Sequence, residues 1–461
     1  MLWTIVKKEF IQQLSTRKLL FSLVTTFILS FFALHISATK YYSTFEVYSN
    51  AVMTQQKAAG DIKALDEDDY NSFDMSDMDY SVIRKPTPMS IYCRGMEDNF
   101  GSVGRLDPLR MPYTAQPFGQ MGTMSGINFE DILKDTFSTI DFTFIVKFFF
   151  SLMVIIISFN IVSNEREQGT LKMIHAQNVS RRTLLNGKWL ANSLLLGICI
   201  FLFILFSMLY VMLSKNIIFN TQDVIRLFLF FLFSFLFALL FFQASLLISC
   251  IFRSSQSVLI TVFLIWLLSL FILPNIGLLI SKRFVEIPPL DYVRTEQHKI
   301  YEQMQKEAST GERPRGQNLM YEIQDAVWGA KQHYLNRLKE QRAVYDLLSL
   351  ISPSQVYSFA SEHIMGTSIR DYDMYMNRVR LENENYTKQV KIMSATPPPP
   401  NFRALQFGVF LSVAEASAQN NRNPLGRSIY NAMPYFVWFI IINGILYFFT
   451  LLYYDRKTNI L

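Results

Sequence analysis

The sequence predicts an α-helical polytopic membrane protein with six transmembrane helices, both termini in the cytoplasm and two large extracytoplasmic insertions. Of its 461 residues, 51% are hydrophobic and only 17% are charged, whereas soluble domains have about 25% charged residues. Six segments contain the roughly 20 apolar residues that a membrane-spanning helix needs. The net charge is +6, and the basic residues lie mainly beside these segments, where they set the orientation of the protein in the membrane. We therefore expect no nucleic-acid partner.

The six predicted spans follow the hydropathy of the chain. They are residues 19–39, 140–164, 189–213, 227–252, 257–281 and 434–454, so that 189–281 holds spans three to five. The second span is the least regular, because Asp141 and Lys147 lie in its outer part. Its charge-free part, Phe148–Asn164, still reaches ~25 Å at the helical rise, and Lys147 can extend its ammonium toward the membrane surface.

Basic residues near the span ends predict the orientation. Twelve of them flank the spans on one side: Lys7, Lys8, Arg17, Lys18, Arg166, Lys172, Arg181, Arg182, Lys188, Arg253, Arg456 and Lys457. The short opposite loop between spans three and four carries only Lys215 and Arg226. The positive-inside rule therefore places both termini in the cytoplasm, with 455–461 as a cytoplasmic tail.

Residues 1–18 are expected to form a cytoplasmic amphipathic helix in the membrane interface. Trp3, Val6 and Phe10 share one helical face, and Lys7 and Lys8 lie opposite, a pattern typical of helices that contact membrane lipid. A plain helical lead into span one is the alternative. A cleaved signal peptide is disfavoured, because no small-residue cleavage site follows the first apolar run.

Two long segments fall on the outer side. Residues 40–139 contain nine basic and fifteen acidic residues. The run "DEDDYNSFDMSDMDY" lacks the Gly and Glu of an EF-hand loop, which favours a solvated acidic loop over a metal site. From Arg84 onward, Pro and Gly punctuate short apolar alternations, so we expect a mixed α/β module. In 282–433, apolar spacings of three and four predict a helical hairpin and a further helix over 354–393.

Motifs for catalysis are absent from the sequence. It has no G-x-x-x-x-G-K-[ST] loop, so we expect the chain to lack a nucleotide-binding site and not to be an enzyme. The cores of spans three to six contain no Asp, Glu, Lys or Arg, which disfavours an ion-coupled transporter. Energy must then come from another subunit.

The spans do contain uncharged polar residues: Asn160, Asn192, Gln243, Asn275 and Asn443. Interhelical hydrogen bonding is their ordinary role in membrane proteins. Lining a substrate path is the alternative.

Between spans two and three the chain reads "NEREQGTLKMIHAQNVSRRTLLNGKWLAN". This stretch resembles the cytoplasmic loop of type-2 ABC exporter permeases, and the order of spans resembles that family too. With its two insertions, the chain resembles a bacterial subgroup of this family that has large extracytoplasmic domains. The resemblance implies a coupling loop over 165–188 that contacts a cytosolic ABC ATPase through Glu165, Arg166, Glu167, Gly169, Thr170, Leu171 and Ile174.

Further expectations follow from this resemblance. ATP and magnesium would bind the partner ATPase, and this chain would hold no cofactor. A second permease copy or a homologous permease would complete a dimer in the bacterial cytoplasmic (inner) membrane. Within the loop, Gly169 allows a turn, Thr170 can cap the next turn, and Leu171 and Ile174 can enter a groove on the ATPase. A simple charged turn is the alternative interpretation.

The resulting hypothesis is the permease subunit of an ATP-driven ABC exporter, which exports a substrate or transmits force across the membrane. The rival hypothesis is a membrane-anchored scaffold or receptor that acts through its extracytoplasmic domains. An extracytoplasmic protein partner is compatible with both hypotheses.

Overall fold

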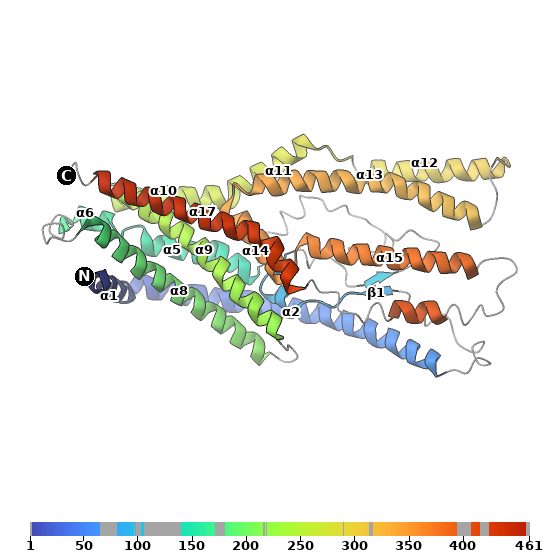
Figure 1. Ribbon diagram of the computed structural model, residues 1–461, viewed down its shortest axis with the longest axis horizontal. Coiled ribbons are helices and arrows are strands. Elements are labelled where there is room, and N and C mark those ends of the chain that lie inside the picture. The colour runs from blue at the N-terminus through green and yellow to red at the C-terminus, as the bar shows by residue number, and fades with distance from the viewer. Residues whose placement is uncertain are drawn as a thin grey trace.

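Six helices long and apolar enough to cross a membrane form an elongated bundle (Figure 1). The computed structural model describes residues 2–64, 81–95, 97, 103–105, 140–170, 180–214, 217, 219–288, 290–312, 317–393, 407–414 and 424–457. The six helices are Arg17–Lys63, Phe142–Glu167, Arg181–Leu213, Thr221–Ile251, Ser255–Phe284 and Leu425–Arg456. The predicted class, a helical polytopic membrane protein, is confirmed.

The two ends of the bundle differ. Both termini lie at one end (Figure 1), together with α1 (Leu2–Leu14) and α6 (Ser163–Glu167). The opposite end carries α12 (Leu290–Ser309), α13 (Gln317–Ser349) and α15 (Ile369–Met393). Helices α12, α13 and α15, which belong to the second predicted insertion, therefore lie at the end opposite the termini.

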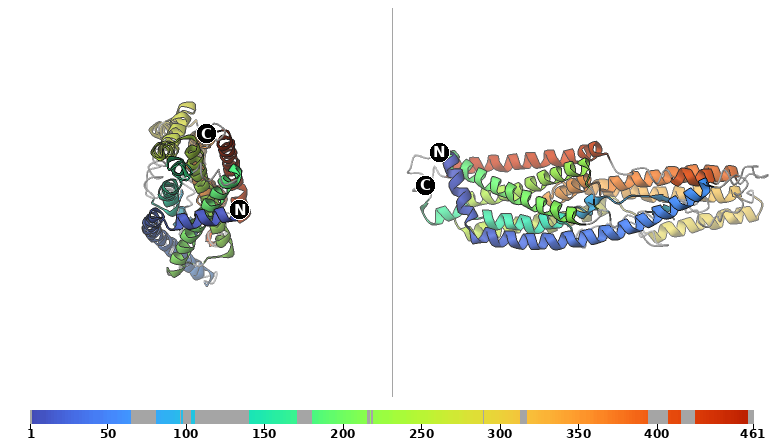
Figure 2. Two further views of the ribbon diagram at one scale, coloured as in Figure 1. Left: turned by 90° about the vertical axis from the view of Figure 1, so that its left-hand side faces the viewer. Right: turned by 90° about the horizontal axis from the view of Figure 1, so that it is seen from below.

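The first insertion begins as a continuation of span one. Helix α2 runs unbroken over Arg17–Lys63, which is ~70 Å at the helical rise and more than twice the hydrocarbon thickness of a bilayer. Figure 2 shows it along most of the molecule. Near its outer end, Ala58 and Ile62 are buried with Phe407 and Phe410.

A small sheet lies within the same insertion. Strands β1 (Ser81–Ile83) and β2 (Val103–Arg105) pair antiparallel, with Val82 opposite Gly104. The short helix η3 (Pro88–Ile91) follows β1. The acidic run and most of the predicted α/β module, 65–80 and 106–139, lie outside the described residues.

Spans two and five each contain one π-helical turn. Span two comprises α4 (Phe142–Ile145), η5 (Val146–Phe150), α5 (Ser151–Ser158) and α6. Span five comprises α10 (Ser255–Leu267), η6 (Leu268–Ile272) and α11 (Leu273–Phe284). Pro274 explains the turn in span five, because its ring lacks a donor and displaces the carbonyl one turn earlier.

The remaining spans pack around α9 (Thr221–Ile251), which contacts α8 (Arg181–Leu213), α17 (Leu425–Lys457) and α5. Helix α14 (Pro353–Met365) packs against α9 and α17. The predicted helix over 354–393 is in fact two helices, because Gly366 adopts a left-handed conformation with φ +74°. Eleven of the thirteen α14 residues are buried, so this helix belongs to the bundle and not to the projecting part.

Candidate functional site at the end of span two

The loop motif begins in α6, a short helix that follows a turn at the end of span two. Ser249 on α9 fixes this turn, because its hydroxyl oxygen accepts from the backbone nitrogens of Val162 (3.2 Å) and Ser163 (2.9 Å). After α6, Gly169 adopts a left-handed conformation with φ +73°. The sequence thus places three charged residues, Glu165 to Glu167, on a fixed turn of helix.

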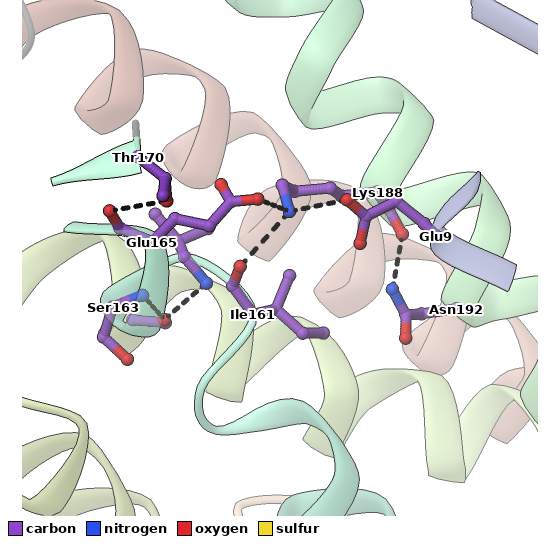
Figure 3. A network of polar contacts seen from close by, with 9 residues as sticks. Glu9, Ile161, Ser163, Glu165, Thr170, Lys188 and Asn192 are labelled. Carbon is purple, nitrogen blue, oxygen red and sulfur yellow. Dashed lines mark hydrogen bonds and ion pairs between the residues drawn. The ribbon is translucent and has the colours of Figure 1, made fainter. Parts of the chain in front are cut away.

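Glu165 takes part in a buried ion-pair network (Figure 3). The ammonium of Lys188 donates to Glu165 Oε1 at 2.7 Å, to Glu9 Oε1 at 2.9 Å and to the carbonyl of Ile161 at 3.3 Å. A lysine has three donors, so all three are used. Lys188 is only 2% exposed, and the network joins α1, α6 and α8.

Arg166 and Glu167 contact two other spans. Arg166 Nη1 donates to the carbonyls of Cys250 (3.2 Å) and Phe252 (3.1 Å), where α9 ends. Glu167 accepts from the backbone nitrogen of Ser255 at 2.7 Å and from its hydroxyl at 3.0 Å, where α10 begins. Each charge suits its helix end, since a C-terminus attracts cations and an N-terminus attracts anions.

The three consecutive charges therefore tie the end of span two to three different spans. The free energy that each contact contributes depends on how deeply the contact is buried. A buried ion pair that loses one partner costs about 3–5 kcal/mol, whereas the exposed Glu167 contact is worth about 1 kcal/mol or less. We call Glu9, Glu165, Arg166, Glu167 and Lys188 the junction.

The rest of the predicted coupling loop is only partly described. The hydroxyl of Thr170 donates to the carbonyl of Glu165 at 3.2 Å, back toward α6. The turn that Thr170 is expected to cap lies outside the described residues. Gly169 is exposed. Leu171 and Ile174 lie outside the described residues.

The predicted interface helix corresponds to α1, which packs on α8. Val6 is buried and Phe10 is half-buried, whereas Trp3, Lys7 and Lys8 are exposed. The two helices approach closely at Gly187, where a Cβ atom would lie 2.7 Å from Ile5 Cγ2.

Sequence reasoning missed Glu9 and Lys188 as site residues. Lys188 was counted only among the basic residues that set orientation. Glu9 lies three residues after Val6, on the same face, and both are buried. A carboxylate on an apolar helix face needs a partner, and that signal points to Glu9.

The five uncharged polar residues lie on five different spans. No hydrogen bond joins any two of the five in the part of the chain that the structure describes. Asn192, Asn275 and Asn443 each donate to a carbonyl of their own helix. Asn443 also donates to Leu236 on α9 at 3.1 Å. Gln243 is buried and Asn160 is half-buried.

Comparison with known families defines the class of the protein. The family described as "ABC-2 family transporter protein" matches residues 3–457, almost the whole chain. No curated protein matches the chain. The chain belongs to the ABC-2 transporter family.

Membership makes this chain a multi-pass permease subunit of an ABC transporter, a class of subunit that is not itself catalytic. The family implies a cytosolic ABC ATPase partner and a typically dimeric assembly.

Proposed function

We propose that this permease subunit serves an ATP-driven exporter, and that the junction receives the motion of a separate cytosolic ABC ATPase. The end with both termini would face the cytoplasm of a bacterium, as the distribution of Lys and Arg favours. Substrate would leave toward the end that carries the insertions, or force would pass to that end. The ATPase would hold ATP and magnesium.

One observation carries this proposal: Glu165, Arg166 and Glu167 each bind a different span. A displacement of the loop after α6 would be transmitted to α8, α9 and α10 together, because hydrogen bonds join these three helices to α6. Such rigid connection is what a hinge or shear transition needs to move packed helices as a unit.

The junction also separates two roles within the loop. The side chains of Glu165, Arg166 and Glu167 bind the permease itself, so they transmit motion. Docking on the ATPase would then fall to the segment after Gly169, with Leu171 and Ile174 as the apolar contacts. A second permease copy or a homologous permease would bring a second junction and a second ATPase.

The test uses the full permease co-expressed with its ATPase and reconstituted in lipid vesicles. Leu171→Asp should prevent co-purification of the ATPase, because a buried charge opposes apolar docking. Arg166→Met with Glu167→Gln should retain the ATPase yet lower ATP-dependent activity by tenfold or more. Gln168→Ala is the matched control, since the Gln168 amide donates to Asn164, one turn earlier in the same segment.

The two variants give distinct outcomes. If Leu171→Asp combined with Glu167→Lys left both ATPase binding and ATP-dependent activity intact, the coupling role would be wrong. If Arg166→Met with Glu167→Gln abolished ATPase binding as fully as Leu171→Asp, these residues would dock and would not transmit.

A further inference from the structure

Helix α14 is held inside the bundle by polar contacts on several sides. At its N-terminal end, the hydroxyls of Ser352 and Ser354 both donate to the carbonyl of Ser269, at 2.8 and 2.9 Å. Ser269 lies in η6, the π-helical turn of span five. At its C-terminal end, Arg226 on α9 donates to the carbonyl of Ile364. Spans four and five thus fix both ends of α14.

Span two donates a hydrogen bond to α14 from Lys147. Lys147 lies in η5, the π-helical turn of span two, and is only 6% exposed. Its ammonium donates to the hydroxyl of Ser358 in the middle of α14 at 2.8 Å. Glu362 lies one turn further along α14, on the same face. Burying a lysine ammonium costs free energy, even though the carboxylates of Asp141 and Glu362 interact favourably with its charge. Turns of π-helix concentrate at functional positions.

Helix α14 also leads directly to the outer hairpin, which we define as α12 and α13. Helix α13 ends at Ser349 and α14 begins at Pro353, so only three residues connect them. The base of α13 rests on α11, where Gln341 donates to the carbonyl of Val285 at 2.7 Å. Any shift of α14 must therefore reach the hairpin base.

We propose that Lys147 transmits the displacement of span two to α14, and through α14 to the outer hairpin. Span two then connects the junction at one end with the hairpin at the other. This inference rests on the proposed function, because it assumes that an ATPase moves the junction. Lys147 is a positioning residue, and the hairpin is the part of the molecule that responds.

The size of the response follows from the length of α13. Its 33 residues span ~50 Å at the helical rise. A tilt of about 6° at the base therefore moves the tip by ~5 Å.

The experiment measures this movement in the reconstituted permease–ATPase complex. Spin labels are attached through Asn50→Cys on α2 and Gln303→Cys on α12, both exposed positions. Pulsed electron–electron double resonance measures the distance between the two spin labels with and without ATP. The complex contains an ATPase variant that binds ATP but does not hydrolyse it. We expect an ATP-dependent change of several ångström.

Two variants remove the link in different ways. Lys147→Met removes the donor, and Ser358→Ala removes only the acceptor hydroxyl, so at least one should fold. Both should abolish the ATP-dependent distance change while the ATPase remains bound. Ser281→Ala is the control, because that buried hydroxyl donates to the carbonyl of Leu278 within its own helix.

The outcomes distinguish this inference from the proposed function. If the distance changes in both variants as it does in the unmodified permease, the inference is overturned. It is also overturned if the ATPase binds the unmodified permease and the distance stays constant. If no ATPase binds through the loop, the proposed function itself fails, and the inference fails with it.

Discussion

Replacing Lys188 by Met tests whether the junction is a buried ion pair or an incidental surface contact. The substitution keeps an unbranched side chain of similar length but removes the ammonium. Glu9 and Glu165 then lose their cation, at contacts of 2.9 and 2.7 Å. Each charge-assisted hydrogen bond is worth about 1.5–3 kcal/mol, and breaking a buried pair costs about 3–5 kcal/mol in total.

We therefore expect Lys188→Met to lower the free energy of unfolding by about 3–5 kcal/mol. The assay is reversible unfolding of the purified permease in mixed micelles, followed by circular dichroism. Adding Glu9→Gln and Glu165→Gln should restore at least half of the loss, because the unpaired carboxylates cause most of it.

Arg182→Met is the matched control on the same helix. It removes an ion pair to Asp455 of similar length, 2.9 Å, but the Arg182 side chain is 76% exposed. Exposed pairs contribute about 0–1 kcal/mol. A Lys188→Met cost as small as that of Arg182→Met would refute the reasoning, as would a triple variant no more stable than the single one.

Three other predictions concern packing and burial. Gly187→Ala should lower the free energy of unfolding by about 1–3 kcal/mol and expose α1 to trypsin, because the new Cβ atom would meet Ile5. The control Gly197→Ala, whose new Cβ atom would lie 3.5 Å from its nearest neighbour, should be neutral or stabilising. Equal effects of the two substitutions would contradict this prediction. Burial raises the pKa of the Glu362 carboxyl to about 7, so its ionised form opposes folding and the unmodified protein loses stability as the pH rises through about 7. Above that pH, Glu362→Gln should be more stable than the unmodified protein by on the order of 1–3 kcal/mol. Melting curves from about pH 5 to pH 8 measure this difference, and a difference that does not depend on pH would contradict the prediction. Burial also raises the pKa of the Cys93 thiol well above its usual range, so maleimide should label it only after denaturation, and rapid labelling of the native protein would rule this out.

The spans and the class could be predicted from the sequence because both depend on local features. A span needs only a sufficient run of apolar residues, and positive-inside counting needs only nearby Lys and Arg. The charged motif Glu165–Glu167 is equally local, because its three residues are consecutive. Its partners could not be predicted, because Arg166 binds backbone carbonyls and every residue carries one.

Helix α14 shows a second limit of sequence reasoning. Its residues include Ser354, Ser358 and Glu362, so hydropathy places it outside the membrane-spanning segments. Ser269, Lys147 and Arg226, on three different spans, supply hydrogen-bond partners that make its burial more favourable. Those partners are distant in the sequence, and no local period predicts them.

The network around Lys188 also sets an order of assembly. Glu9 and Lys188 are 179 positions apart in the chain. At about 5–20 residues per second, synthesis of that stretch takes roughly 9–36 s. During this time Glu9 lacks the cation that it binds in the folded protein, and we expect α1 to stay on the membrane surface, where Trp3 and Lys7 suit the lipid headgroups. Docking of the first helix is therefore a late event, and it reports that span three has been inserted.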